Sequence, residues 1–248
     1  MKVLGIIPAR YASTRFPGKP LVVIHGKTMI QRVYEQATAS HSLDKVIVAT
    51  DHRTIEKHVF SFGGNVLMTS GKHKSGTERC WEVADKLKEA GENYEVIINI
   101  QGDEPYIDPR QISQVCECFG RENVEIATLA KKIQNHEELS SPNVVKVVWG
   151  LNHRALYFSR RAIPYLREKD LSDGIQITKY FKHIGIYGYR SNILQEIIQL
   201  KTSPLEAAES LEQLRWLEHG YPIFVMETEY ESIAIDIPAD LLKITNRS

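Results

Sequence analysis

Short apolar runs rich in β-branched residues recur along the chain, and segments with a different spacing lie between them. The runs are VLGII, KVIVAT, EVIINI, EIATLA and VVKVVW, and each has the length and composition of a β-strand. Between the first of them, TMIQRVYEQATAS and HRTIEKHVFSF place apolar residues three and four positions apart, as amphipathic helices do. This alternation predicts βαβ units, and therefore an α/β fold with a mainly parallel sheet.

The predicted strands are almost continuously apolar, which indicates a sheet covered by helices on both faces. Ligands of such sheets bind beyond the carboxyl ends of the strands, where the connecting loops gather. The loops that follow the strands are therefore where we expect the functional residues.

The pattern changes near residue 143. NVVKVVW, ALYFS and FKHIGIYGYR are strand-like with little helix between them, and REKDLSDGIQITKY has the polarity of a surface loop. We expect a small antiparallel extension or subdomain at about 130–190, within a single domain that spans 1–248.

A helix is predicted over residues 204–219, in SPLEAAESLEQLRWLEHG. Ser203 is the expected N-cap, Pro204 opens the first turn, Glu206 completes a capping box and Gly220 ends the helix. The apolar seam of this helix consists of Leu211, Leu214 and Leu217.

Composition narrows the class of protein. The chain has 248 residues, 42% of them apolar, which is enough for a sizeable core. Lysine plus arginine equals aspartate plus glutamate at 31 each, so no net charge draws the chain to nucleic acid or to an anionic membrane. Any preference for anions must come from local clusters of cations.

Three cysteines cannot all pair, and Cys116 and Cys118 lie two apart on a predicted helix, where their side chains diverge. We expect reduced core thiols rather than a redox or zinc site. The N-terminal apolar run is too short for a signal peptide, and no other run approaches the about 18 residues that a membrane helix needs. These features predict a cytoplasmic protein.

The loop after the first predicted strand carries a cluster of cations. In GIIPARYASTRFPGKPL, Arg10, Arg15 and Lys19 lie close together, but there is no G-x-G-x-x-G with which backbone amides could hold a pyrophosphate. Two guanidinium groups and an ammonium suit a triphosphate, on which charge develops during transfer. The alternative is a solvated basic turn.

Two aspartates are candidate magnesium ligands. Asp103 follows the apolar strand of EVIINIQGDEP, and Asp236 is expected at the end of a short strand in ESIAIDIPADL, before a helix that starts near Pro238. Mg²⁺ prefers one or two carboxylates together with phosphate oxygens. The alternatives are a Gly-Asp turn at Asp103 and a helix cap at Asp236.

The segment HKSGTERC offers hydroxyl groups, a glycine and Arg79, a set that could hold a nucleobase or a ribose. The alternative is an ordinary helix start, with Ser75 as the N-cap and Glu78 as the third helical residue.

Together these motifs resemble one enzyme family. The segments are IIPARYASTRFPGKPL, VATDH, HKSGTER, NIQGDEP, VKVV, ALYFSR, KHIGIYGYR, PLEAAESLEQLR and IDIPADL, and the chain is similar from end to end to the 3-deoxy-manno-octulosonate (KDO) cytidylyltransferases. The resemblance implies a Rossmann-like nucleotidyltransferase fold, a homodimer, and transfer of CMP from CTP to KDO in lipopolysaccharide biosynthesis. Ile237 stands where the family usually has threonine.

The resemblance also implies roles for individual residues. Arg10, Lys19 and Asp103 are implied as catalytic residues, and Asp103 and Asp236 as ligands of Mg²⁺. The implied nucleotide-binding residues are Pro8, Ala9, Arg10, Arg15, Lys19, His73, Ser75, Gly76, Thr77, Arg79 and Gln101. The implied sugar-binding residues are Arg160, His183, Tyr187, Glu212 and Gln213.

Three other functions compete with this one. A cytidylyltransferase could use another sugar acid, such as sialic acid. A nucleotide-sugar-dependent glycosyltransferase normally presents paired acidic residues rather than a single aspartate after Gln-Gly. A non-catalytic nucleotide-binding module would keep the basic loop without needing both Asp103 and Asp236.

Overall fold

The computed structural model describes residues 1–12, 16–167, 177–231 and 233–241. The main strands are β1 (Val3–Ala9), β4 (Lys45–Thr50), β5 (Val66–Met68), β6 (Val96–Asn99), β7 (Ile126–Lys132), β8 (Lys146–Trp149), β9 (Ala155–Ser159), β10 (Phe181–Arg190) and β11 (Ile223–Glu227). The α-helices are α1 (Met29–Thr38), α2 (Arg53–Ser61), α3 (Gly76–Glu89), α4 (Pro109–Cys118), α5 (His136–Ser140), α7 (Ser191–Ile197), α8 (Pro204–Glu209) and α9 (Glu212–Glu218). Shorter elements are the hairpin of β2 (Val23–Ile24) and β3 (Lys27–Thr28) and the 3-10 turns η1 (Lys19–Leu21) and η2 (Pro238–Asp240).

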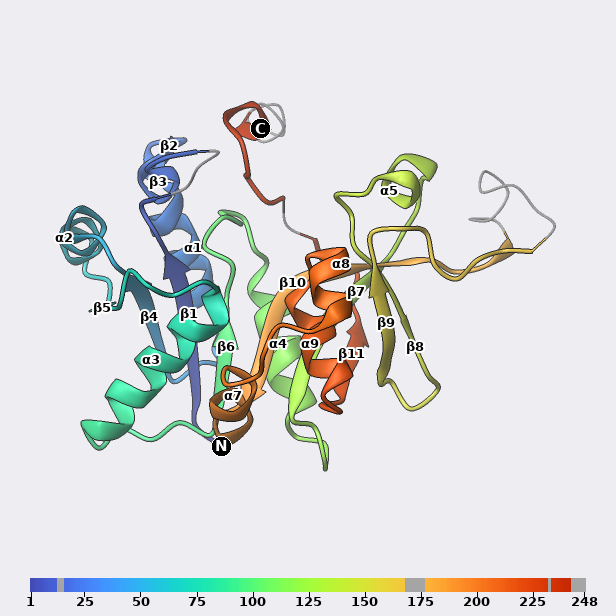
Figure 1. The fold of residues 1–248 in the computed structure, drawn as a ribbon. Coiled ribbons are helices and arrows are strands. Elements are labelled where there is room, and N and C mark those ends of the chain that lie inside the picture. Colours follow the sequence, from blue (N-terminus) through green and yellow to red (C-terminus); the bar gives the residue numbers. More distant parts are fainter. Residues whose placement is uncertain (13–15, 168–176, 232, 242–248) are drawn as a thin grey trace.

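One mixed sheet organises the chain, in the order β11-β7-β10-β6-β1-β4-β5. Strands β4, β1 and β6 are parallel neighbours, as the βαβ pattern predicts, and β11 is parallel to β7. The α/β class with a mainly parallel arrangement is confirmed (Figure 1).

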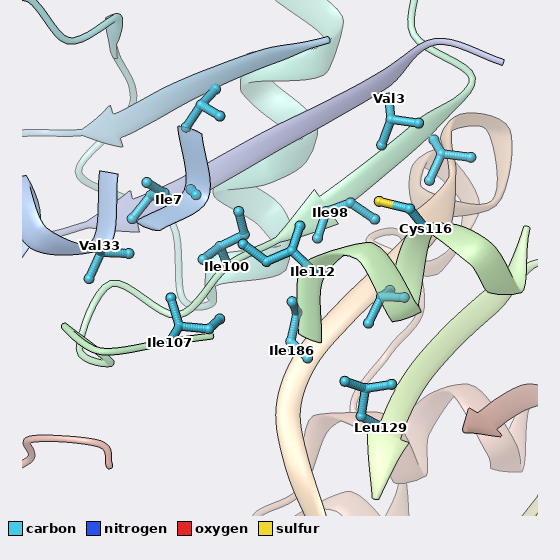
Figure 2. Close-up of a cluster of buried hydrophobic side chains, with 14 of the residues drawn as sticks. Val3, Ile7, Val33, Ile98, Ile100, Ile107, Ile112, Cys116, Leu129 and Ile186 are labelled. Carbon is cyan, nitrogen blue, oxygen red and sulfur yellow. The ribbon is translucent and has the colours of Figure 1, made fainter. Parts of the chain in front are cut away.

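Helices cover both faces of this sheet, because its strands carry apolar side chains on both. One core packs the sheet against α1, α2 and α4, and Figure 2 shows Ile98 of β6 and Ile186 of β10 in the same cluster as Ile112 of α4. A second core, on the opposite face, packs it against α3, α7 and α9. Because helices cover both faces of the sheet, the ends of its strands remain the part that a ligand can reach.

The segment at about 130–190 divides between the sheet and an extension. Strands β8 and β9 form an antiparallel hairpin that projects from the main sheet, as expected for the extension (Figure 1). Strand β10, in contrast, lies inside the main sheet, antiparallel to both β6 and β7. It thereby brings its residues to the centre of the molecule.

The prediction of one continuous helix over residues 204–219 is wrong. Ser203 and Glu206 form the predicted capping box, but α8 ends at Glu209 and α9 starts at Glu212. Ser210 adopts a left-handed conformation with φ 52°, which breaks the helix. The break gives α9 its own first turn, and Glu212 lies in it.

All three cysteines are buried and free of disulfide bonds. Among the described residues, no helix is long and apolar enough to cross a membrane.

Candidate active site

The candidate site lies where β1 and β6 end side by side (Figure 1). The backbone after β6 passes so close to β1 that a Cβ at Gly102 would lie 2.5 Å from the carbonyl oxygen of Pro8. Glycine is required there, because any other residue would push the two loops apart. This contact sets the loop of Lys19 beside the loop of Asp103.

A cavity of about 360 Å³ opens between these loops. Eleven of the residues predicted to bind nucleotide or metal line it: Pro8, Ala9, Arg10, Lys19, His73, Ser75, Gly76, Arg79, Gln101, Asp103 and Asp236. Its remaining lining residues are Pro20, Lys74 and Gly102. Arg15 lies outside the described residues.

Lys19 connects the two candidate metal ligands. Its Nζ lies 2.8 Å from Oδ2 of Asp103 and 3.5 Å from Oδ1 of Asp236. Since both oxygens lie near one nitrogen, the two carboxylates share a single place at the cavity wall. A cation already lies between them, and paired carboxylates are ligands that Mg²⁺ accepts, so this donor set fits a magnesium ion.

Asp236 reaches this place by a route that differs from the predicted one. Residues 233–236 form no strand, so the expectation of a strand ending at Asp236 is wrong. Instead, the amide of Ile235 donates a 2.9 Å hydrogen bond to the carbonyl of Asp103, and η2 follows at Pro238. This backbone contact aligns the two aspartates.

The start of α3 faces the same cavity. Ser75 caps the helix by accepting a hydrogen bond from the amide of Glu78, as the capping interpretation predicts. The helix N-terminus, which carries partial positive charge, therefore opens into the cavity at Gly76. Capping and nucleotide binding are thus compatible at Ser75.

His73 and Arg79 are held in place by carboxylates. His73 Nε2 contacts Glu82, and its Nδ1 lies 3.5 Å from Oε2 of Glu78. Burial alone would raise the pKa of Glu82. Hydrogen bonds from Lys86, the Ser70 amide and His73 outweigh this effect and lower the pKa to about 2.

The guanidinium of Arg79 is buried, donates to the hydroxyl of Thr69, and pairs with Asp51 at 2.9 Å. Because this pair fixes its side chain, Arg79 presents a rigid surface to the cavity.

A second cavity of about 200 Å³ adjoins the first. It is lined by Pro8, Gly76, Thr77, Asn99, Gln101, Gly102, Tyr187, Tyr189, Glu212, Gln213 and Trp216. Pro8, Gly76, Gln101 and Gly102 line both cavities. A ligand in one cavity can therefore contact a ligand in the other.

Glu212 supplies the acidic group of the second cavity. Its carboxylate accepts 2.8 Å hydrogen bonds from the Thr77 hydroxyl and from Arg215. Burial raises the pKa of Glu212, against the lowering effect of Thr77 and Arg215. The bond to Thr77 ties the start of α9 to the start of α3.

Buried polar atoms of this cavity without a hydrogen-bond partner in the described part of the chain include Oδ1 of Asn99, Nε1 of Trp216 and the hydroxyl oxygens of Tyr187 and Tyr189. Unpaired buried polar atoms are rare in proteins. An acceptor and a donor left open at one cavity are suited to a ligand rich in hydroxyl groups.

Gln101 is oriented at the boundary between the two cavities. Its side-chain amide donates a 2.7 Å hydrogen bond to the carbonyl of Gly185, where the pairing of β10 with β7 is irregular. The bond fixes the amide nitrogen, which leaves the side-chain oxygen available to a ligand.

Arg160, a predicted sugar-binding residue, lines neither cavity. Its guanidinium donates hydrogen bonds to the carbonyl groups of Glu209, Pro142 and Ser210, while its amide donates to the Glu209 carboxylate. In this structure Arg160 stabilises the break between α8 and α9.

His183 also lies away from both cavity linings, although Tyr187 on the same strand lines the second. The His183 ring contacts the Thr128 hydroxyl at 3.0 Å and packs on Phe158. Burial lowers the pKa of His183 to about 3. The ring is therefore neutral at physiological pH and offers a hydrogen bond rather than a charge.

Sequence reasoning missed several lining residues that carried local signals. Asn99 is a polar residue in an otherwise apolar strand, and Tyr189 shares a strand face with Tyr187 because it lies two positions later. Trp216 follows Gln213 by three positions on a helix, so both lie on one side.

Known proteins resemble this chain over its whole length. The family profile described as Cytidylyltransferase matches residues 4–232. A protein of Parabacteroides distasonis named 3-deoxy-manno-octulosonate cytidylyltransferase is 54% identical, over 98% of this chain and 96% of its own length. A protein of the same name from Thermodesulfovibrio yellowstonii is 50% identical, over 97% of this chain and 96% of its own.

Solved structures also resemble this chain over its whole length. A CMP:2-keto-3-deoxy-manno-octonic acid synthetase in complex with CTP superposes with a TM-score of 0.90, at 42% identity, over 99% of this chain and 98% of that one. The 4-diphosphocytidyl-2C-methyl-D-erythritol synthase of Anaerococcus prevotii, at 12% identity and a TM-score of 0.63, shares the fold alone; the match covers 99% of this chain and 95% of that one.

Proposed function

This chain belongs to the 3-deoxy-manno-octulosonate cytidylyltransferase family, and on that premise we propose that it transfers CMP from CTP to KDO, for lipopolysaccharide biosynthesis. The reaction releases pyrophosphate. The anomeric hydroxyl of KDO attacks the α-phosphorus of CTP in line, so that a new oxygen–phosphorus bond forms while the bond to the β-phosphate breaks.

The observation that carries the proposal is the pair of cavities with a common wall. One is lined by cations that follow β1 and by cations at the start of α3, and the other by tyrosine, glutamate, glutamine and asparagine side chains. A triphosphate needs the first kind of surface and a polyhydroxylated sugar acid the second. The shared wall at Gln101 and Gly102 is where the two reactants would meet.

In the nucleotide cavity, Arg10 and Lys19 stabilise the negative charge that grows on the departing pyrophosphate. Arg10 is exposed at the cavity mouth, whereas the Lys19 side chain is only 16% exposed. Charges held in a partly desolvated place need little reorganisation during the reaction, which makes them effective in catalysis. Positioning and charge neutralisation supply the rate, without a protein nucleophile.

Mg²⁺ belongs to the proposal as the cofactor, held by Asp103 and Asp236. When bound, it neutralises phosphate charge as a Lewis acid. The two aspartates would hold the ion, and Lys19, which lies within ion-pair distance of both, balances their charge.

In the sugar cavity, Glu212 and Gln213 bind hydroxyl groups of KDO, and Tyr187 lines the same cavity. Asn99 and Trp216 add an open acceptor and an open donor. These groups orient the anomeric hydroxyl toward the shared wall, and Gln101 fixes the distance between sugar and nucleotide.

The assembly and the site of action are parts of the proposal too. Leu151 and Leu156, on the β8–β9 hairpin, are fully and 67% exposed. Apolar groups exposed on a projecting hairpin suit a contact with a second copy of the chain, so we propose a homodimer. A cytoplasmic location follows from the use of CTP.

The experiment is a measurement of CTP-dependent pyrophosphate release with Mg²⁺, screened across KDO, sialic acid and hexose 1-phosphates. Release with KDO, at a kcat/KM well above that for sialic acid, is the expected result. Preference for sialic acid would favour the alternative sugar acid, and no release with any acceptor would contradict the proposal. A glycosyltransferase would not release pyrophosphate from free CTP.

A further inference from the structure

After β11 the chain crosses the edge of the sheet and carries Asp236 to the nucleotide cavity (Figure 1). We call residues 228–231 and 233–237 the C-terminal strap. Because the strap forms no strand, the sheet does not fix the position of Asp236. Contacts at the two ends of the strap must do so.

The end near the cavity is held by backbone contacts. Ile235 is fully buried beside Ile24 and Met29, and its amide donates to the carbonyl of Asp103. The carboxylate of Asp240 accepts hydrogen bonds from the amides of Asp236 and Ile237, at 2.9 and 3.1 Å. These bonds fix the local turn, but they do not determine where the strap enters it.

The other end is held by a cluster of charges. Glu231 contacts the ammonium group of Lys182 on β10 and lies 3.0 Å from Nζ of Lys131 on β7. Lys182 also contacts Glu138 of α5, and its side chain is only 8% exposed. Lys182 thus holds two carboxylates from different parts of the chain.

The environment of these groups makes the contact firm. Glu231 pairs with two lysines, and one of them, Lys182, has its ammonium in a poorly solvated place. Opening the contact would give up charge-assisted interactions there, so the pair resists opening. Hydrogen bonds from Lys182 and Lys131 lower the pKa of Glu231, although burial alone would raise it. The carboxylate is therefore ionised at neutral pH.

Other contacts at this end of the strap involve Tyr230 and Thr228. Gln111 donates to the carbonyl of Tyr230 at 3.3 Å, and the exposed guanidinium of Arg110 lies 4.0 Å above the Tyr230 ring. The Thr228 hydroxyl bonds Gln114 at 2.7 Å, close to the end of β11. The charged cluster is the contact at this end in which a carboxylate of the strap pairs with lysines of two strands of the main sheet.

We propose that Glu231 is a positioning residue: its pair with Lys182 holds the C-terminal strap so that Asp236 lies beside Asp103. The inference rests on the proposed role of Asp236 at the magnesium site. It adds a residue outside both cavities that acts on the reaction only through Asp236.

The test compares Glu231→Gln with Glu138→Gln. Each substitution removes one of the two carboxylates of Lys182 and leaves the other, so both variants keep the buried ammonium paired. Only Glu231→Gln releases the strap, whereas Glu138→Gln affects α5. Glu138→Gln is therefore a matched control for general loss of stability, which melting temperatures measure in both.

Two readouts are expected to change in Glu231→Gln alone. Hydrogen exchange of the Ile235 amide, measured without Mg²⁺ or substrates, should become about tenfold faster, because local opening of the strap becomes easier. The Mg²⁺ concentration for half-maximal rate should rise by about fivefold, while the KM values for CTP and KDO stay within about twofold.

Several results would overturn the inference. Wild-type exchange at Ile235 in Glu231→Gln would show that the pair does not hold the strap. An unchanged Mg²⁺ requirement, or the same changes in Glu138→Gln, would remove the specific link to Asp236. If the wild-type rate did not depend on Mg²⁺, the proposed cofactor would be contradicted. The hydrogen-exchange measurement, made without metal, would still show whether Glu231 holds the strap, so the two failures can be told apart.

Discussion

Nζ of Lys19 lies 2.8 Å from Oδ2 of Asp103, although 84 positions separate them in the sequence. The contact joins the loop after β1 to the loop after β6, and Asp236 approaches the same ammonium from the C-terminal strap. A cation and two carboxylates thus meet at the wall where a triphosphate would lie. The first predictions concern these three residues.

Replacing Lys19 by alanine is expected to reduce kcat/KM by about 10²-fold or more, because a charge aimed at the leaving group is lost. The melting temperature should fall by only a few degrees, since the Asp236 side chain is 48% exposed and can be solvated. Lys27→Ala is the matched control, as Lys27 forms an exposed pair with Glu35 and lines neither cavity. Near wild-type activity of Lys19→Ala would refute the phosphate role.

Asp103 and Asp236 are expected to act as one unit. Each single change to asparagine keeps the shape and removes a charge, and should reduce kcat by about 10²-fold or more. The double variant should lose far less than the product of the two single losses, because one shared site is already impaired. A double-mutant cycle on kcat measures this, and multiplicative losses would assign the two aspartates separate roles.

Glu212→Ala should raise the KM for KDO by about tenfold and leave the KM for CTP within about twofold, since the carboxylate lines the sugar cavity. Glu218→Ala is the control, because Glu218 is an exposed glutamate on the same helix. Initial rates with each substrate varied in turn give both constants. An equal effect on CTP would place Glu212 in the nucleotide site or in the structural core.

The raised pKa of Glu212 predicts a pH-dependent effect on stability. Burial favours the neutral acid, so the folded-state pKa lies above the ordinary value of 4.5 and ionisation costs stability as the pH rises through it. Glu212→Gln should therefore be more stable than the wild type at neutral pH, with the difference vanishing below pH 4.5. Denaturant unfolding at pH 4 and pH 7.5 checks this, and a variant less stable at both values would contradict the sign.

The sequence predicted the parallel half of the sheet because each βαβ unit joins neighbours in the chain. It did not predict that β10 lies between β6 and β7, since that order depends on pairing between residues 49 to 94 positions apart. The consequence is functional, because β10 brings Tyr187 and Tyr189 to the second cavity.

Two further differences have local causes. The left-handed Ser210 breaks the predicted helix. Arg160, which follows β9, donates hydrogen bonds to the carbonyl groups of Glu209 and Ser210, a tertiary contact that helix propensity does not contain. Asp236 was expected on a strand because its neighbours are β-branched, yet those side chains pack on a small core around Ile24. The sequence therefore predicted the residue types of the site, but it did not predict the course of the backbone that brings these residues together.

The proposal of two adjoining substrate cavities is tested most directly by a crystal structure with CTP, Mg²⁺ and a KDO analogue that lacks the anomeric hydroxyl. We expect the triphosphate to contact Arg10 and Lys19, Asp103 and Asp236 both to lie at the metal or its bound waters, and the analogue to contact Glu212 and Gln213. Carboxylates pointing to different places, or an analogue bound away from the second cavity, would contradict the proposal.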